Sequence, residues 1–283
     1  MNRSNHYPGI RQAIWLLVLI FFLMIVLSIS VGILDGIVDF SFGEHPATLA
    51  IVNLIAIGLL LMWGLKKAKA SFKEVFSFVP MRMSLFLPMS LTIIGVGILL
   101  SELDNLLRTV LPMPAVIADF YMNLFLGQKS LWGSFVLVVV VAPLTEELLF
   151  RGLILRGFLS RYTMRKAVLA SAILFGIFHL NPWQFLGAAI MGVLFAWLFV
   201  RTRSLLPCFF GHALNNALPL ILLGIFNLEI PGVTTIFTKV EFQPLWLDLF
   251  GLLLAGLGLW LLNRMFGKAD EIPPEDLIIT QSQ

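Results

Sequence analysis

Charged residues are scarce in this chain of 283 residues. They make up 12% of it, whereas hydrophobic residues make up 59%, and an ordinary soluble domain carries roughly 25% charged residues. A water-soluble fold of this length could not bury so much apolar surface, because surface area does not shrink fast enough as size grows. The composition therefore excludes an ordinary soluble domain and predicts a protein whose solvent is largely lipid.

Cysteine is nearly absent as well. The single Cys208 excludes an internal disulfide, and its position in an apolar run favours a buried, unreactive thiol. No A-x-A-like cleavage site follows the first apolar run, so we expect an uncleaved first helix rather than a signal peptide. The net charge of +3 gives no indication of a nucleic acid partner.

Long apolar runs are abundant. A helix that crosses a membrane needs about 20 mostly apolar residues. Eight stretches are candidates: 12–34, 47–65, 84–100, 131–160, 167–180, 183–200, 205–226 and 245–262. The fourth is longer than one crossing needs, and the fifth is short and ends at Asn181-Pro182, a helix stop. We therefore predict an all-α, polytopic membrane helix bundle of about eight transmembrane helices.

The distribution of basic residues predicts the orientation, because Lys and Arg collect in short cytoplasmic loops. With a cytoplasmic N-terminus, 16 of the 19 basic residues fall in cytoplasmic segments, and Arg108, Lys129 and Lys239 fall outside. If one of the eight helices did not cross the membrane, the basic residues after it would change sides and would no longer concentrate on one side. The pattern thus supports eight crossings with both termini cytoplasmic.

Two segments lie outside these spans. Residues 101–129 mix charged and apolar residues and contain two prolines, which predicts one or two amphipathic helices on the outer face. Residues 268–283 are polar and are predicted to be a disordered tail. No internal repeat is visible, so residues 1–267 are expected to form a single transmembrane domain.

Few ionisable residues fall within the predicted spans. Among the acids they are Glu146, Glu147 and Asp248, and among the histidines they are His179 and His212. Ionisable groups are costly inside a membrane and are functional candidates by default. The search for a site therefore begins with these side chains.

The fourth span carries Glu146-Glu147 followed by Arg151. Adjacent helical residues point about 100° apart, so the two acids cannot have the same role. Glu147 and Arg151 are four residues apart in the favourable order for an ion pair. That pair would leave Glu146 to face a cavity, where a carboxylate can act as a general base. The alternative is that both acids only pair with nearby arginines.

The fifth and seventh spans contribute the other polar groups. Phe175 lies one helical turn before His179 and shares its face, although a lone histidine can equally be a packing residue. His212 and Asn216 are also four residues apart on one face. They could hold a developing oxyanion or only hydrogen-bond between helices. Facing lipid would cost several kcal/mol per group, so we expect all these side chains to converge on one interior cavity.

The ordered motifs E-E-x-x-x-R, F-x-x-x-H and H-x-x-x-N on successive helices resemble the CPBP family. This family comprises CAAX proteases and bacteriocin-processing enzymes, is also called the Abi family, and includes the type II CAAX prenyl endopeptidases. Within residues 143–226 the motifs stand as Glu146-Glu147 to Arg151, Phe175 to His179, and His212 to Asn216.

The resemblance implies an eight-helix intramembrane endopeptidase of a bacterial plasma membrane, with its cavity open to the cytoplasmic side. Its substrate would be a membrane-associated protein or peptide, prenylated or otherwise lipid-anchored, and the bilayer its other partner. Glu146 and His179 would serve a nucleophilic water, and His212 and Asn216 would stabilise the oxyanion. The supporting residues would be Glu147, Arg151 and Phe175.

The sequence leaves the metal and two other functions open. Glu146, His179 and His212 form a suitable zinc set with water in the open position. A carboxylate alone can also activate water, and H-E-x-x-H is lacking, which favours a metal-free site. The alternatives to a protease are a transporter or proton relay and a catalytically silent scaffold or immunity protein. The paired interrupted helices of many transporters are not visible.

Overall fold

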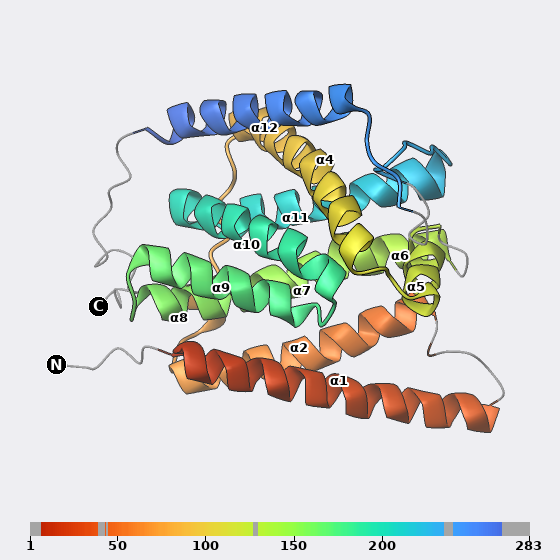
Figure 1. The fold of residues 1–283 in the computed structure, drawn as a ribbon. Coiled ribbons are helices and arrows are strands. Elements are labelled where there is room, and N and C mark those ends of the chain that lie inside the picture. Colours follow the sequence, from red (N-terminus) through yellow and green to blue (C-terminus); the bar gives the residue numbers. More distant parts are fainter. Residues whose placement is uncertain (1–6, 39–42, 44, 127–129, 235–239, 268–283) are drawn as a thin grey trace.

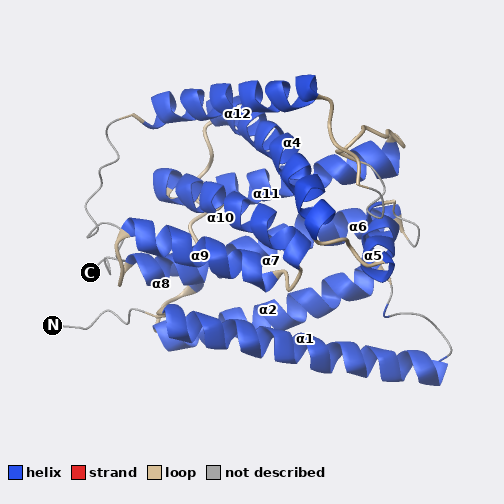
Figure 2. Cartoon of the chain, in the orientation of Figure 1, coloured by secondary structure: helices blue, strands red, loops and turns tan. Residues whose placement is uncertain are grey.

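The computed structural model describes residues 7–38, 43, 45–126, 130–234 and 240–267, and these form helices and loops without strands (Figure 2). The predicted tail, 268–283, lies outside the described residues. The elements are α1 (Ile10–Val38), α2 (Pro46–Ala68), α3 (Phe72–Val75), η2 (Met83–Leu85), α4 (Phe86–Val110), α5 (Ala115–Phe125), α6 (Leu131–Phe135), η3 (Val136–Val141), α7 (Ala142–Glu147), η4 (Leu148–Leu155), α8 (Arg156–Leu159), α9 (Met164–Phe178), α10 (Pro182–Thr202), α11 (Leu206–Pro219), η5 (Leu220–Ile225) and α12 (Leu245–Phe266).

The prediction of an all-helical membrane bundle is confirmed. Seven helices are long and apolar enough to cross a membrane. The remaining predicted span, the fifth (167–180), corresponds to α9, whose 15 residues extend for roughly 22 Å at 1.5 Å per residue, less than a hydrocarbon core of about 30 Å. The chain is thus an integral membrane protein, and the described residues supply seven helices long enough to cross, with the shorter α9 at the position of the fifth predicted span.

The helices form a layered bundle. In Figure 1, α1 and α2 lie along one side, α12 and α4 along the other, and α7 to α11 lie between them. The first turn of α1 and the last turn of α12 are at the same end of the bundle. The cytoplasmic placement of this end remains a prediction from the basic residues.

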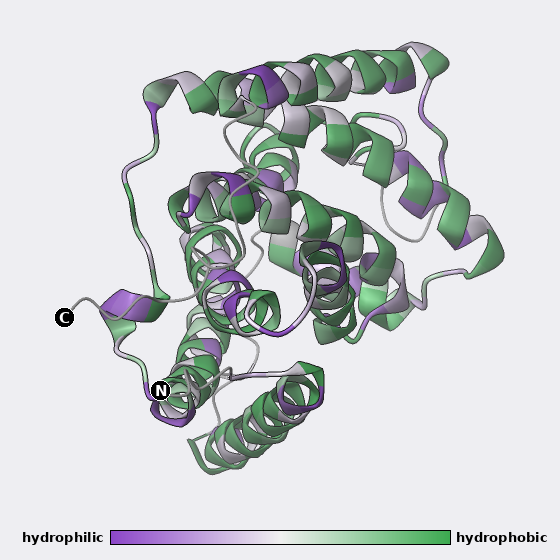
Figure 3. Cartoon of the chain, turned by 90° about the vertical axis from the view of Figure 1, so that its left-hand side faces the viewer, coloured by the Kyte–Doolittle hydropathy of each residue, from purple (hydrophilic) through white to green (hydrophobic). Residues whose placement is uncertain are grey.

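Apolar side chains cover the outside of the bundle. Hydrophobic residues predominate along the helices, and hydrophilic ones occur in short patches (Figure 3). On the outer helices, Phe22 is 63% exposed and Leu253 is also 63% exposed. Such exposure of large apolar side chains matches a surface that contacts lipid rather than water.

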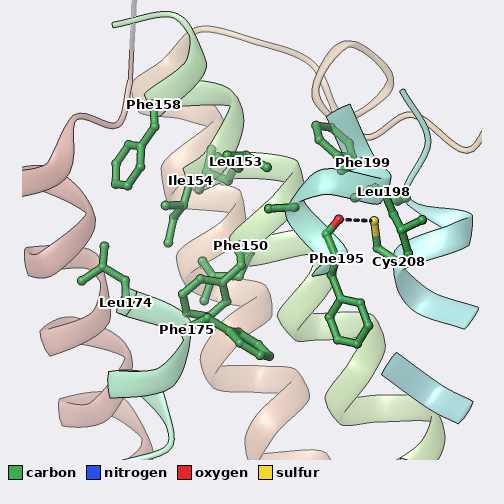
Figure 4. Packing of buried hydrophobic residues seen from close by; sticks show 14 of the residues in the cluster. Phe150, Leu153, Ile154, Phe158, Leu174, Phe175, Phe195, Leu198, Phe199 and Cys208 are labelled. Atoms are coloured by element: carbon green, nitrogen blue, oxygen red, sulfur yellow. Dashed lines mark hydrogen bonds between the residues drawn. The ribbon is translucent and has the colours of Figure 1, made fainter. Parts of the chain in front are cut away.

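The most buried long helix is the continuous segment Leu131–Leu159. In its apolar stretch 56% of the residues are buried, whereas the corresponding share is 17–39% in the six other long helices. Phe150 and its neighbours pack against Phe175 of α9 and Phe195 of α10 (Figure 4). Cys208 is fully buried there, and its thiol donates to the Phe195 carbonyl at 3.2 Å. The predicted buried thiol is therefore confirmed.

The third predicted span ended too early. Helix α4 continues to Val110, ten residues beyond the predicted end at residue 100. Its polar residues are satisfied by one another, since Arg108 pairs with Asp104 at 2.9 Å and donates to Asn105 Oδ1 at 2.6 Å. These contacts reduce the cost of carrying Glu102 and Asp104 on an apolar helix. Only α5 then remains of the predicted amphipathic helices.

Candidate active site

The two adjacent acids lie at the end of α7, between two stretches with π-helical hydrogen bonding, η3 and η4. Pro143 lies in the first turn of α7 and has no backbone N–H to donate, which removes one α-helical bond at this point. π-Helical turns are rare and frequent at functional sites. The widened turns on either side help to set where Glu146 and Glu147 project into the bundle.

Glu147 forms the predicted ion pair. Its Oε1 lies 2.9 Å from Nη1 of Arg151, and both side chains are 1% exposed. Arg151 also donates from Nη2 to the Gly192 carbonyl of α10 at 3.1 Å. The pair therefore anchors the central helix to α10, and the charge of Arg151 is compensated where water is scarce.

Glu147 has a second partner that the sequence did not reveal. Nδ1 of His212, on α11, lies 2.8 Å from the same Oε1. A carboxylate can only accept, so His212 donates its Nδ1–H and the ring is fixed with Nε2 pointing the other way. Glu147 thus holds an arginine and a histidine from different segments in one arrangement.

Glu146 lies on the opposite side of the His212 ring. Its Oε2 is 3.9 Å from Nε2 of His212, which is too long for a direct hydrogen bond. The residue is 8% exposed, and Oε2 has no hydrogen-bond partner among the described residues. A buried carboxylate oxygen without a protein partner can accept a hydrogen bond from water or substrate.

Charge balance bears on the state of His212. Glu146 and Glu147 as carboxylates and Arg151 as a cation leave one negative charge in a buried group. One proton, carried by Glu146 or by Nε2 of His212, would neutralise the cluster, and burial favours neutrality. With the proton on His212, Nε2 carries a hydrogen that can be donated, in addition to the Nδ1–H that Glu147 accepts.

Aromatic rings enclose the ion pair and the histidine. The Arg151 guanidinium lies 4.4 Å from the centre of the Phe175 ring and 5.3 Å from that of Phe195. His212 stacks on Phe195 with ring centres 5.3 Å apart. These contacts favour the cations through the negative faces of the rings and restrict the rotation of His212.

The Phe175 ring contacts both His179 and His212, and so links His179 to the group formed by Glu147, Arg151 and His212. His179 is the C-cap of α9, and its Nδ1 lies 2.9 Å from the Phe175 carbonyl. The Phe175 ring centre is 5.1 Å from the His179 ring and 5.6 Å from the His212 ring. Because Nδ1 donates to a carbonyl, Nε2 of a neutral His179 is an acceptor. The described contacts do not join His179 to Glu146 directly.

Asn216 lies one turn after His212 on α11 and is partly buried. Its Nδ2 donates to the Val138 carbonyl of η3 at 3.0 Å, and Asn215 donates to its Oδ1 at 3.1 Å. One of the two Nδ2 hydrogens is thereby used to attach α11 to the central helix. The second remains for an oxyanion or a water molecule.

Two supporting residues were missed by the sequence analysis. Thr145 Oγ1 lies 2.7 Å from Oδ1 of Asn53, on α2, and 2.8 Å from the Val141 carbonyl. This contact joins α2 to the residue that precedes Glu146. The presence of Asn53 in an apolar helix was a signal of the same kind as those used for the histidines.

The three candidate metal ligands, Glu146, His179 and His212, are not assembled as a ligand set. Within the part of the chain that the structure describes, no group of three or more His, Cys, Asp and Glu side chains is arranged to hold a metal ion. Glu146 and His212 are 3.9 Å apart, whereas His179 meets them only through an aromatic ring. This donor arrangement does not fit tetrahedral zinc.

Residues 128–218 match a family model described as "Type II CAAX prenyl endopeptidase Rce1-like". The resemblance to this family is confirmed. The Rce1-like segment contains every motif residue from Glu146 to Asn216.

Two relatives from Bacillus subtilis (strain 168) are similar to the chain. "Uncharacterized protein YyaK" is 28% identical over 158 residues, which cover 50% of this chain and 52% of the relative. "Putative membrane peptidase YdiL" is 31% identical over 83 residues, which cover 29% of this chain and 34% of the relative. The matches thus span about half and one third of these relatives, and no solved structure matches significantly. Together, the Rce1-like segment and these relatives indicate a membrane protein with a CAAX-protease type of fold.

Proposed function

We propose that this protein is an intramembrane endopeptidase that hydrolyses a peptide bond of a protein or peptide associated with the membrane, such as a prenylated or lipid-anchored one. The observation that carries the proposal is the buried Oε2 of Glu146, 3.9 Å from Nε2 of His212, within the Rce1-like segment. This distance places the proposed base, Glu146, and a proposed oxyanion donor, His212, within reach of one substrate carbonyl group.

Glu146 is the general base in this mechanism. A water held near its carboxylate and Nε2 of His179 attacks the carbonyl carbon, and Glu146 takes the proton that the water loses. The carbonyl oxygen becomes an oxyanion as the new C–O bond forms. Glu146 then delivers its proton to the amide nitrogen as the C–N bond breaks, which yields a carboxylic acid and an amine.

His212 and Asn216 stabilise the oxyanion. The Nε2–H of doubly protonated His212 and the second Nδ2 hydrogen of Asn216 are the two donors. Glu147 accepts the Nδ1–H of His212 at 2.8 Å and so fixes the ring. The Nε2–H group on the other side of the ring therefore needs no reorientation during the reaction. Preorganised donors of this kind are worth roughly 3–4 kcal/mol each in a dry site.

The membrane setting follows from the same proposal. The chain belongs in a bacterial plasma membrane, with the basic end of the bundle and the access to the site on the cytoplasmic side. Membrane-anchored substrates reach such a site by lateral diffusion in the bilayer.

The test compares protein termini in bacterial membranes that contain the full chain or a variant. We expect new peptide termini in membrane proteins with the parent chain, and their loss with Glu146→Gln and His179→Ala. Glu229→Gln is the matched control, because Glu229 is an exposed acid that belongs to none of the motifs. Thermal unfolding of each purified variant verifies that it has folded.

Equal numbers of new termini with the parent and with folded Glu146→Gln would contradict the proposal and support a catalytically silent protein. Ion flux across proteoliposomes is measured with the same variants, because a proton relay would also depend on Glu146. Flux that depends on Glu146 without any cleavage would favour the transporter alternative instead.

A further inference from the structure

A cavity of about 280 Å³, whose described lining includes none of the motif residues, lies at the end of the bundle that holds the ends of α10 and α12. Its walls come from the segment before α4, from the turn between α10 and α11, and from the last turn of α12. The hydrogen bond from Ser204 Oγ to the Val79 carbonyl, 2.7 Å long, joins the first two of these walls. The cavity is therefore formed by segments that are distant in sequence but attached to one another.

Two arginines provide the charge of this cavity. Arg82 and Arg201 line it from different segments, and the lining that the structure describes includes no acidic residue. The hydroxyls of Thr202 and Ser204, which also line it, already donate to the Leu198 and Val79 carbonyls. The cavity therefore has a guanidinium group on each of two walls, and Arg side chains match phosphate oxygens in geometry as well as in charge.

The remaining walls are apolar and continue onto the surface of the bundle. Leu85, Met81 and Phe266 line the cavity. Met265 near the end of α12 also lines it and is 37% exposed, and Leu87 at the start of α4, two residues after Leu85, is 66% exposed. An anion with an attached apolar chain could therefore place its charge at the arginines and its chain along the neighbouring helices.

The cavity lies at the membrane boundary. Its residues occur where long apolar helices begin or end, as α4 does at Phe86, α10 at Thr202 and α12 at Phe266. This is also the end with the predicted cytoplasmic basic residues, and anionic lipids of that leaflet are attracted to such segments. We propose that the cavity bounded by Arg82 and Arg201 binds the phosphate of an anionic phospholipid headgroup.

The experiment measures binding to the full chain in detergent micelles by calorimetry. The probes are a short-chain phosphatidylglycerol, the corresponding zwitterionic phosphatidylcholine, and inorganic phosphate. The parent chain is compared with Arg82→Gln, Arg201→Gln and the double variant. Lys73→Gln is the matched control, because Lys73 is an exposed basic residue of α3 that does not line the cavity.

We expect phosphatidylglycerol to bind more tightly than phosphatidylcholine, and the double variant to raise its Kd at least tenfold. Lys73→Gln should leave the Kd unchanged, and inorganic phosphate should not displace the lipid. A Met81→Trp variant keeps both arginines but fills the cavity, and it should weaken binding even if an arginine variant fails to fold.

Three results would overturn the proposal. Phosphatidylglycerol binding that is unaffected by the double variant and by Met81→Trp would show that the cavity is not the site. An equal loss with Lys73→Gln would indicate diffuse charge attraction. Inorganic phosphate that binds as tightly as phosphatidylglycerol and displaces it would assign the arginines to a soluble phosphate compound rather than to a lipid.

Discussion

Glu147 accepts a hydrogen bond of 2.8 Å from His212, a residue 65 positions later in the chain. The same carboxylate oxygen is 2.9 Å from Arg151, which in turn reaches the backbone of α10. Three helical segments are therefore attached through one buried oxygen atom. A supporting residue of the sequence motif is thus also the residue that positions His212.

Glu147→Gln should destabilise the protein by about 3–5 kcal/mol, because it leaves the charge of the buried Arg151 unpaired. The double variant Glu147→Gln, Arg151→Met removes both charges and should recover a large part of this loss. Peptide-bond cleavage should remain lost in both variants, because an amide oxygen accepts the Nδ1–H of His212 more weakly than a carboxylate does and no longer fixes the ring. Thermal unfolding in detergent and the assay of new termini measure the two effects separately.

Recovery of stability and cleavage together in the double variant would show that Glu147 only neutralises Arg151. Arg151→Met alone is the matched comparison. It leaves the bond between Glu147 and His212 in place while removing the ion pair.

Gly95→Ala should separate α4 from α12 and destabilise the protein by about 1–3 kcal/mol. A Cβ at this position would overlap the backbone N of Ala255 and lie 2.6 Å from the Gly251 carbonyl oxygen. Backbone atoms of a neighbouring helix cannot move aside as a flexible side chain can. Close approach through small residues is the usual means of packing helices in membranes.

Gly256→Ala is the control for this change. Gly256 lies on α12 one residue after Ala255, and a Cβ there would meet nothing within 4 Å. Alanine favours a helix over glycine by up to about 1 kcal/mol, so this variant should be neutral or slightly stabilising. Equal unfolding temperatures for the two alanine variants would show that the α4–α12 contact is not as close as described.

The sequence predicted the helices well, because apolar run length alone determines most of a membrane fold. The predicted start at residue 245 is the first residue of α12, and the predicted end at residue 226 is one residue beyond η5. The prediction for α4 was wrong by ten residues, because polar side chains were taken to end the span. Asn105 also donates to the Gly232 carbonyl, and Glu102 accepts from the Gln243 backbone N–H. An apolar run does not reveal such tertiary contacts.

The candidate site was predictable in its residues but not in its connections. The scarcity of ionisable groups singled out Glu146 and His212, and helical spacing predicted the pair between Glu147 and Arg151. The bond between Glu147 and His212 could not be foreseen, because it depends on how two helices are placed and rotated. The π-helical turns beside Glu146 were likewise invisible, since no periodicity marks them. The roles assigned to these residues in catalysis stay predictions.

A pH titration tests the short helix α3 outside the membrane. Hydrogen bonds from the Ser71 backbone N–H, and then from its hydroxyl group, hold the pKa of Glu74 below its ordinary value. Because the folded-state pKa is lowered, this capping stabilises α3 above the ordinary pKa and is lost as pH falls through the folded-state pKa. An NMR titration should place the carboxyl pKa below 4.5, the ordinary value.

Ser71→Ala should return the pKa of Glu74 toward its ordinary value, because the side-chain partner of the capping box is removed. The carboxyl titration of Glu229, which is exposed and lies on another segment, should be the same in both proteins. A Glu74 titration that Ser71→Ala does not alter would contradict the capping box.

Variants of Thr145 and Asn53 test whether α2 holds Thr145, the residue before Glu146, in place. We expect Thr145→Val and Asn53→Ala to show a coupling energy of about 0.6 kcal/mol, the usual scale for hydrogen bonds between membrane helices. A double-mutant cycle on unfolding in detergent measures it, with cleavage followed in the same four proteins. The control cycle pairs Asn53→Ala with Thr202→Val, because the Thr202 hydroxyl donates within its own helix to Leu198 and distant sites should add independently. Equal coupling in the two cycles would mean that the contact of 2.7 Å does not link α2 to the central helix, and another feature of the fold would have to hold Glu146 in place.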